Sequence, residues 1–115
     1  MEVARAGVNF IDTYYREGLY PAELPLTAGN EGVGAVSAVG EGVTDVAVGD
    51  RVAWCLVNGQ GYTTHAVVPA EKTVPVPDAV SDEQAVAAMV QGMTAHFLAR
   101  EVWPLHAGDT VLVHA

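Results

Sequence analysis

Apolar and polar positions alternate in short runs over most of the chain, and turn-forming residues separate these runs. Residues 31–40 (EGVGAVSAVG) and 43–54 (VTDVAVGDRVAW) are rich in valine, and residues 62–69 (YTTHAVVP) combine β-branched and aromatic side chains. Two prolines and a Gly-Asn pair in residues 21–30 predict a loop. The valine–proline alternation of residues 73–81 suits an edge strand or an extended connector. Short strands separated by turns at this spacing are typical of a small β-barrel or sandwich.

The period of the apolar pattern changes at Ser81, where we predict that a helix begins. Ser81 and Gln84 have the spacing of a capping box, in which each side chain bonds the other residue's backbone. Asp82 and Glu83 follow in the first turn, where the helix dipole favours carboxylates. One apolar face comes next, formed by Val86, Met89, Val90, Met93 and Phe97. Gly92 costs about 1 kcal/mol relative to alanine, which predicts that a neighbouring group approaches it closely.

The last residues predict a strand that is buried on both faces. Pro104 ends the helical pattern, a Gly-Asp turn follows, and residues 110–115 (TVLVHA) form a nearly continuous apolar run. Such runs are typical of parallel sheets covered by helices on both faces. A parallel strand needs a partner reached through a crossover of a dozen or more residues. We therefore expect the chain to be a fragment in which a second domain has only begun.

Composition and charge narrow the classes of partner. The 115 residues are 50% apolar, which fits one globular domain with a core. The formal charge is −9, from 14 acidic and 5 basic residues. This charge repels phosphate backbones, and no Lys/Arg cluster is present to bind an anionic membrane. We expect no nucleic-acid partner and no membrane partner. With no long apolar run and no leader-like segment, we expect a cytoplasmic protein.

Cysteine, histidine and glycine offer little chemistry at their observed spacings. The single cysteine, Cys55, excludes an intramolecular disulfide and has apolar neighbours, so a small buried side chain is favoured over a reactive thiol. The possible metal ligands among these residues are Cys55, His65, His96, His106 and His114. They form no C-x-x-C or H-x-x-x-H pattern, so we expect no metal site. The glycine run of residues 29–43 fails the G-x-G-x-x-G spacing at Ser37, which favours tight strand packing over phosphate binding.

Residues 7–20 (GVNFIDTYYREGLY) hold the best candidate site. Asn9 and Asp12 interrupt an apolar half, and three of the four tyrosines follow: Tyr14, Tyr15 and Tyr20. Amide and carboxylate groups beside flat phenol rings suit a planar polar ligand. The same residues also fit a structural role, in which Asn9 and Asp12 cap a short helix and the tyrosines pack over it. Thr94 offers a similar choice between a hydroxyl that faces a ligand and one that bonds a carbonyl one turn earlier.

Three segments carry a family resemblance. Residues 6–21 (AGVNFIDTYYREGLYP) contain an N-F-x-D segment, and residues 29–54 contain motifs of the form G-x-E-G-x-G-x-V-x-x-V-G and G-D-R-V. Residues 81–98 (SDEQAVAAMVQGMTAHFL) are similar to a helix that joins a catalytic domain to a nucleotide-binding domain. Together they resemble the zinc-free quinone oxidoreductase branch of the medium-chain dehydrogenase/reductase superfamily. The resemblance spans nearly the whole chain.

The resemblance implies a mainly β fold. We expect a GroES-like, partly open β-barrel with a C-terminal helix and the first strand of an absent Rossmann domain. Residues 1–80 would be the GroES-like catalytic domain without its N-terminal strands. Residues 81–115 would be the connecting helix and the start of a truncated nucleotide-binding domain. An open sheet edge and an exposed apolar last strand would favour a homo-oligomer.

The resemblance also implies an activity. The chain would be the catalytic-domain fragment of an enzyme that transfers a hydride or electrons from NADPH to a quinone or an activated alkene such as an enone. Asn9 and Asn30 stand where zinc-dependent relatives have a Cys and a His ligand, and the third ligand position falls near Val90, so we expect no zinc. The isolated chain would be inactive and bind NADPH weakly or not at all, because the phosphate-binding turn lies outside it. A non-enzymatic, stand-alone GroES-like binding or interaction module is the second interpretation.

The residues of the implied site fall into two sets. Those that would border the reacting groups are Asn9, Tyr14, Tyr20 and Thr94. Those that would contact the cofactor are Phe10, Ile11, Asp12, Thr13, Tyr14 and Phe97. None is an acid–base group suited to an evident catalytic role, which agrees with direct hydride transfer by a cofactor that the protein holds close to its acceptor.

Overall fold

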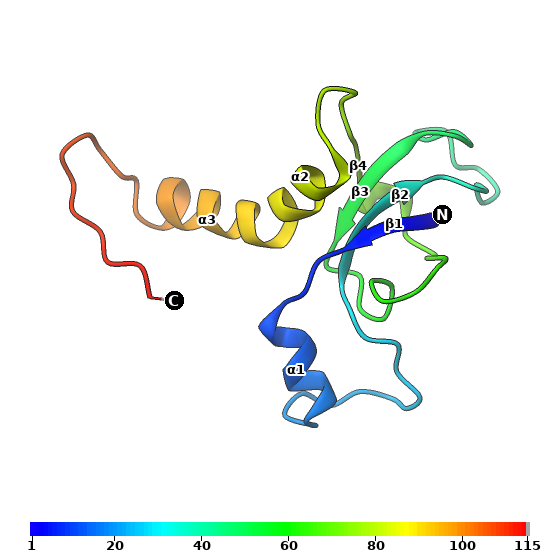
Figure 1. Ribbon diagram of the computed structural model, residues 1–115, viewed down its shortest axis with the longest axis horizontal. Coiled ribbons are helices and arrows are strands. Elements are labelled where there is room, and N and C mark those ends of the chain that lie inside the picture. The colour runs from blue at the N-terminus through cyan, green and yellow to red at the C-terminus, as the bar shows by residue number, and fades with distance from the viewer. Residues whose placement is uncertain (115) are drawn as a thin grey trace.

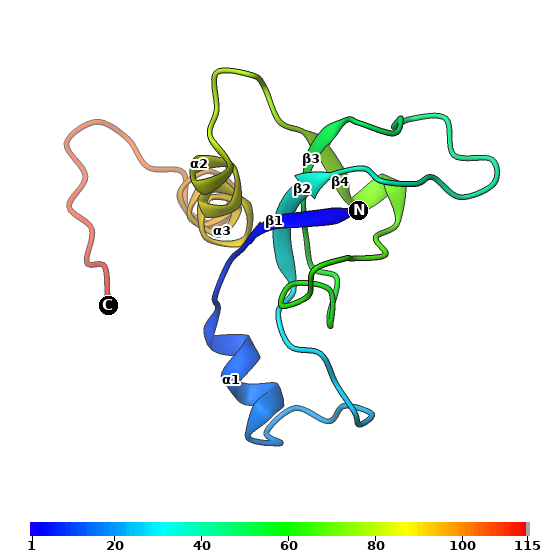
Figure 2. The same cartoon turned by 45° about the vertical axis from the view of Figure 1, so that its right-hand side comes forward.

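The computed structural model describes residues 1–114, which form an open antiparallel sheet and one long, interrupted helix (Figure 1). The four strands lie in chain order and are β1 (Glu2–Ala6), β2 (Glu31–Ala35), β3 (Arg51–Cys55) and β4 (Thr73–Pro75). The short helix α1 (Phe10–Arg16) follows β1, and a 3-10 turn, η1 (Ala70–Lys72), precedes β4. Figure 2 shows α1 below the sheet and the long helix beside it.

Glycines in β2 allow the strands on either side to approach. A Cβ atom at Gly34 would lie 2.0 Å from the backbone oxygen of Glu2 in β1. At Gly32 it would lie 2.5 Å from the ring of Trp54 in β3. Both distances are far shorter than a van der Waals contact, so no side chain fits at either position. The tight strand packing predicted for this glycine run is confirmed at Gly32 and Gly34, whereas a Cβ at Gly40 would make only an ordinary contact.

Two of the predicted strand regions are mostly loop. Residues 36–50 connect β2 to β3 through turns, and residues 62–69 contribute only an isolated bridge between His65 and Glu2. Strand propensity alone does not form a strand. Residues 36–50 pair with no strand, and residues 62–69 meet β1 at this one bridge, where the Val3 N–H donates to the Thr64 oxygen and the Ala66 N–H to the Met1 oxygen. The edge strand predicted within residues 73–81 is confirmed as β4.

The predicted helix begins after Ser81 and continues as four joined segments. They are α2 (Asp82–Ala87), the π-helical η2 (Ala88–Gly92), α3 (Met93–Phe97) and the π-helical η3 (Leu98–Val102). The capping box is confirmed: the Gln84 backbone N–H donates to Ser81 Oγ over 3.2 Å, and the Ser81 N–H donates to Gln84 Oε1 over 3.0 Å.

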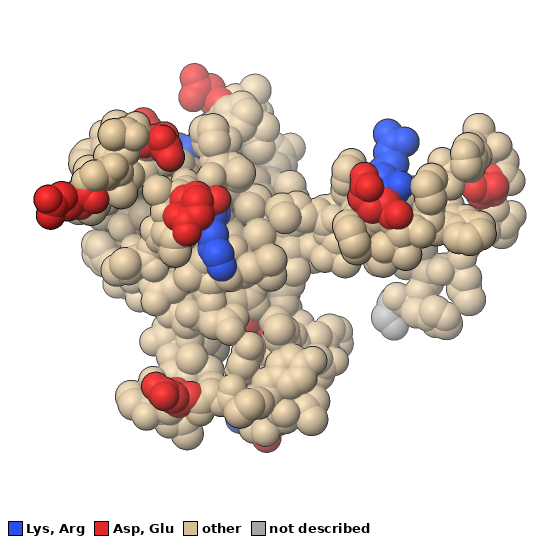
Figure 3. Space-filling view, turned by 180° about the vertical axis from the view of Figure 1, so that it is seen from behind, with Lys and Arg blue, Asp and Glu red and all other residues tan. Residues whose placement is uncertain are grey.

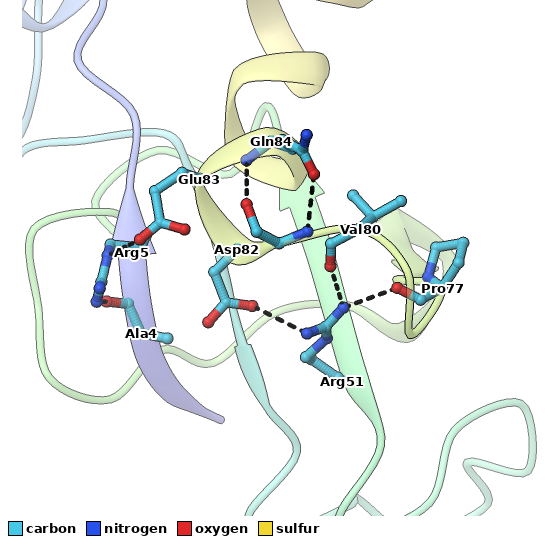
Figure 4. A network of polar contacts seen from close by, with 9 residues as sticks. Ala4, Arg5, Arg51, Pro77, Val80, Asp82, Glu83 and Gln84 are labelled. Carbon is cyan, nitrogen blue, oxygen red and sulfur yellow. Dashed lines mark hydrogen bonds and ion pairs between the residues drawn. The ribbon is translucent and has the colours of Figure 1, made fainter.

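Arg51 of β3 fixes the start of this helix to the sheet (Figure 4). Its Nη2 donates to the backbone oxygen of Pro77 over 2.8 Å and to that of Val80. Its Nη1 lies 3.6 Å from Asp82 Oδ1 in the first turn of α2. One guanidinium therefore bonds both the connector that leads into the helix and the helix itself.

The hydrophobic core lies between the sheet and the first turns of the helix. It consists of Val33, Ala53, Cys55, Val76, Ala85, Val86 and Met89. Only the first part of the predicted apolar face reaches it, because Val86 and Met89 are buried whereas Met93 and Phe97 are 49% and 56% exposed. The helix continues past the edge of the sheet, so its second half does not reach this core (Figure 1).

Two expectations for the C-terminal third are wrong. A Cβ at Gly92 would meet no atom closer than Ala88 Cβ at 3.6 Å, which is an ordinary contact, so no group approaches Gly92 closely. Residues 110–114 form no strand, and Leu112 and Val113 are 80% and 83% exposed. A parallel strand takes its hydrogen bonds from a neighbour, and none lies beside this segment within residues 1–114. Ala115, the last residue of the predicted strand, lies outside the described residues.

The charged side chains are dispersed. On the face shown in Figure 3 the Lys and Arg side chains stand apart from one another among more numerous carboxylates. None of the helices described in residues 1–114 is long and apolar enough to cross a membrane.

We expect Gly34→Ala to lower the free energy of unfolding by about 1–3 kcal/mol, because its methyl group would overlap the Glu2 carbonyl and push β1 away from β2. Gly40→Ala is the matched control, since its nearest contact would be Val43 Cγ2 at 3.8 Å. Urea denaturation of the three proteins measures the difference. Equal midpoints for the two variants would contradict the prediction.

Candidate functional site

The helix α1 begins at Asn9 through a cap that it shares with Asp12. The Asn9 N–H donates to Asp12 Oδ2 over 2.9 Å, and the Asp12 N–H donates to the backbone oxygen of Asn9 over 3.0 Å. Asn9 has extended backbone angles, as residues that precede a helix do. The capping role that the sequence left open for these two residues is therefore present.

Asp12 has further partners beyond its cap. Asp12 is only 7% exposed, and its carboxylate accepts from the Tyr62 hydroxyl over 2.7 Å and from Asn30 Nδ2 over 3.2 Å. None of the ion pairs within residues 1–114 involves Asp12. Neutral donors thus stabilise a buried charge, which would otherwise be costly.

Tyr62 is held as a hydrogen-bond donor by this contact. Partial burial, the hydrogen bond to Asp12 and the negative charges of Asp12 and Glu31 raise the pKa of Tyr62 to about 12. All of these influences disfavour the phenolate, so the hydroxyl stays protonated at neutral pH.

Glu31, the first residue of β2, is the second buried carboxylate and is 0% exposed. Its Oε1 accepts from Asn9 Nδ2 over 2.7 Å and from Gln91 Nε2 over 3.2 Å. Its Oε2 accepts from the backbone N–H of Val90 over 2.8 Å. Gln91 Nε2 also donates to Asn9 Oδ1 over 2.9 Å. The beginning of α1, the beginning of β2 and the segment η2 therefore meet at one carboxylate.

The tyrosines of the predicted site pack against one another. Tyr20 makes edge-to-face contacts with Tyr14 and Tyr15, with ring centroids 5.5 Å and 5.7 Å apart. Tyr15 and Tyr20 also line a cavity of about 580 Å³, together with Arg16 and the loop that follows α1. Packing and cavity lining are both observed, so the structural and the ligand-binding interpretations are compatible here.

The remaining predicted residues lie on two surfaces. On α1, Phe10 is 80% exposed, Ile11 is half-buried, and the Thr13 hydroxyl donates to the Phe10 carbonyl over 2.7 Å. On α3, Thr94 and Phe97 are exposed. The helix residue that reaches the start of α1 is Gln91, at the end of η2.

The sequence reasoning missed three residues of this site: Glu31, Tyr62 and Gln91. A carboxylate inside a run of small apolar residues was an available signal for Glu31. Tyr62 and Gln91 carried no local signal, because they meet Asp12 and Glu31 from 50 and 60 residues away along the chain. Near the third ligand position that the resemblance suggested, Val90 supplies only its backbone N–H, and the side chain present is that of Gln91.

The donor set does not fit zinc. No group of three or more His, Cys, Asp or Glu side chains in the described part of the chain is arranged to hold a metal ion. The amide nitrogens of Asn9 and Asn30 donate to Glu31 and Asp12, and an amide nitrogen has no lone pair for a metal. The Asn30 carbonyl oxygen is buried without a donor among residues 1–114, but a single neutral oxygen does not make a zinc site.

Cys55 has the structural character that its neighbours predicted. It belongs to the core and is 8% exposed, and burial raises the pKa of its thiol. Its Sγ lies 4.0 Å from Met93 Sδ. A thiol that stays protonated is a poor nucleophile.

Comparison with known proteins identifies the family. Residues 1–78 match the alcohol dehydrogenase GroES-like domain, and the chain belongs to that family. It is 49% identical over 110 residues to a quinone oxidoreductase of Pseudomonas aeruginosa, an alignment that covers 95% of this chain and 34% of that protein. The chain thus spans about a third of this relative's length.

Two solved structures agree with this assignment. A mycobacterial protein complexed with NADPH superposes with a TM-score of 0.88 at 46% identity, over 95% of this chain and 34% of the other. The quinone oxidoreductase of Escherichia coli complexed with NADPH gives 0.83 at 40% identity, over 90% and 32%. The expected GroES-like fold and the resemblance to the quinone oxidoreductase branch are confirmed.

We expect Tyr62→Phe to remove the most alkaline step from the phenolate absorbance titration of the folded chain. Tyr20→Phe is the control and should retain that step. Because the pKa of Tyr62 is raised from 10.0 to about 12 by folding, its contribution to stability is complete below pH 10.0. That contribution is lost as the pH rises to about 12. An unchanged titration in Tyr62→Phe would show that the Tyr62–Asp12 bond is absent.

Proposed function

We propose that the protein carrying this chain is an oxidoreductase that transfers a hydride from NADPH to a quinone. The observation that carries the proposal is the likeness of almost the whole chain to proteins solved with NADPH bound, one of them a quinone oxidoreductase. NADPH would supply the hydride, and the residues of this chain would bind and orient the two reactants.

The surface around the start of α1 supports this role. Phe10 offers an exposed apolar ring, and the exposed Gln91 side chain is held in place by Asn9 and Glu31. A flat aromatic surface beside a fixed amide suits a nicotinamide, which has an apolar ring and a carboxamide. We propose that the nicotinamide contacts Phe10, Ile11, Asp12, Thr13, Tyr14 and Phe97.

The quinone would lie beside that surface. We propose that it is bordered by Asn9, Tyr14, Tyr20 and Thr94, with the 580 Å³ cavity next to Tyr20 as the route to the pocket. Because hydride transfer needs close and correctly oriented reactants, the contribution of these residues is proximity and exclusion of water.

Three further proposals complete this picture. The reaction needs no zinc, because Asn9 and Asn30 stand where zinc-dependent relatives have ligands. The amide groups of these two residues donate to the carboxylates of Glu31 and Asp12. The chain alone is inactive, with residues 1–80 as catalytic domain and 81–115 as the link to a nucleotide-binding domain. A cytoplasmic location and a homo-oligomer stay predictions.

We expect the full-length protein to oxidise NADPH when 1,4-benzoquinone is added, and to keep this activity in the presence of a zinc chelator. Absorbance of NADPH measures the rate, with NADH and a simple enone as comparison substrates. The chain of residues 1–115 should show no turnover under the same conditions. Absence of any cofactor oxidation by the full-length protein would favour the non-enzymatic binding module.

We expect Phe10→Ala in the full-length protein to raise the KM for NADPH about tenfold, because lost burial of an aromatic side chain against the nicotinamide costs roughly 1.4 kcal/mol. Phe10 is 80% exposed in this chain, so the fold should tolerate the change. Val67→Ala, at another exposed apolar side chain (85%), is the control and should leave KM unchanged. Equal KM values in both variants would remove Phe10 from the cofactor surface.

A further inference from the structure

We infer that Glu31 is a positioning residue: its buried carboxylate takes over a backbone hydrogen bond of the long helix and thereby sets where Gln91 lies relative to α1. The inference rests on the proposed function in one respect, because Gln91 and α1 form the surface on which the nicotinamide is proposed to bind. The contacts of Glu31 themselves are independent of that function.

The helix is irregular at the point where Glu31 touches it. Residues 88–92 form the π-helical η2 between two α-helical segments. In a regular α-helix the N–H of Val90 would donate to the carbonyl four residues earlier. Here it donates to Glu31 Oε2 over 2.8 Å. Insertion of a side chain into the hydrogen-bond ladder is an established cause of such interruptions, and a bond to a carboxylate is stronger than one between neutral groups.

The other oxygen of Glu31 connects the helix to α1. Glu31 Oε1 accepts from both Asn9 Nδ2 and Gln91 Nε2, and Gln91 Nε2 also bonds Asn9 Oδ1. The three side chains therefore form a closed triangle of hydrogen bonds. Because Glu31 is fully buried and forms no ion pair within residues 1–114, all three of its donors are needed to offset the loss of water.

Gly7 provides the space that this carboxylate occupies. A Cβ atom at Gly7 would lie 2.0 Å from Glu31 Oε1 and 2.5 Å from Glu31 Cδ. The chain between β1 and α1 thus lacks a side chain at the point that the carboxylate occupies, so Gly7→Ala offers a second way to displace Glu31 without altering it.

The consequence concerns the geometry of the proposed pocket. The apolar core ends near Met89, and Met93 is already half exposed, so apolar packing does not hold Gln91. The bonds of Glu31 hold it instead. A displacement of about 1 Å at a surface that orients a hydride donor can cost roughly a hundredfold in rate.

The direct test uses the unaltered chain and nuclear magnetic resonance. We expect a scalar coupling across the hydrogen bond between the ¹⁵N nucleus of Val90 and the ¹³Cδ nucleus of Glu31. Absence of this coupling, in a spectrum where couplings across the β2–β3 ladder are observed, would overturn the inference. This measurement needs no variant, so it stands even if the substitutions below prevent folding.

The second test is amide hydrogen exchange in Glu31→Gln, Gly7→Ala and the control Glu71→Gln, which makes the same chemical change at an exposed glutamate. We expect exchange at Val90 to become about tenfold faster in the first two variants, while Ala53 in β3 keeps its protection. The control should match the unaltered chain. No change at Val90, or equal acceleration at Val90 and Ala53, would overturn the positioning role.

The third test uses the full-length protein. We expect Glu31→Gln to lower kcat for quinone reduction at least tenfold with Ala53 still protected from exchange. Full kcat together with accelerated exchange at Val90 would overturn the link between Glu31 and the pocket. If the unaltered protein oxidises no NADPH, the proposed function fails, and the Val90–Glu31 coupling then decides the structural part of the inference by itself.

Discussion

The buried carboxylates of Asp12 and Glu31 hold together the parts of the chain that the sheet does not join. Neither carboxylate forms an ion pair within residues 1–114. A buried charge is costly unless hydrogen bonds replace its water. The donors come from the start of α1, from η2 and from the segment that contains Tyr62. Both carboxylates receive their hydrogen bonds only when these segments assemble in one arrangement. Hydrogen bonds specify that arrangement more closely than apolar packing does, because they depend on direction.

The apolar core contacts the first turns of the long helix, and the hydrogen-bonded side chains of Asn9 and Glu31 contact its middle. Arg51 and the core residues bind its first turns to the sheet, and the bonds of Glu31 begin where the core ends at Met89. Beyond Gln91 the helix has exposed apolar residues, among them Phe97 and Leu98 at 56% and 54%. The same helix is thus structural at its start and exposed along its second half, and the proposed cofactor surface lies at the transition.

The proposed chemistry is consistent with this division. Within residues 1–114 no group of three or more His, Cys, Asp or Glu side chains is arranged to hold a metal ion, and Tyr62 stays protonated at neutral pH because its pKa is raised to about 12. Fixed amides and exposed aromatic rings can hold a planar cofactor and its acceptor in contact, and that is the contribution expected from the protein when the cofactor itself carries the hydride.

The sequence by itself determined the features that depend on neighbouring residues: the capping box at Ser81, the edge strand in residues 73–81, the glycine contacts of β2 and the burial of Cys55. Its motifs also identified the family and predicted Asn9 and Asp12 as residues of a candidate site. The tertiary structure decided which valine-rich segments pair as strands, and it left residues 110–114 exposed. It alone brought Tyr62 to Asp12 and Gln91 to Glu31, because these contacts join residues 50 and 60 positions apart and no local pattern encodes them.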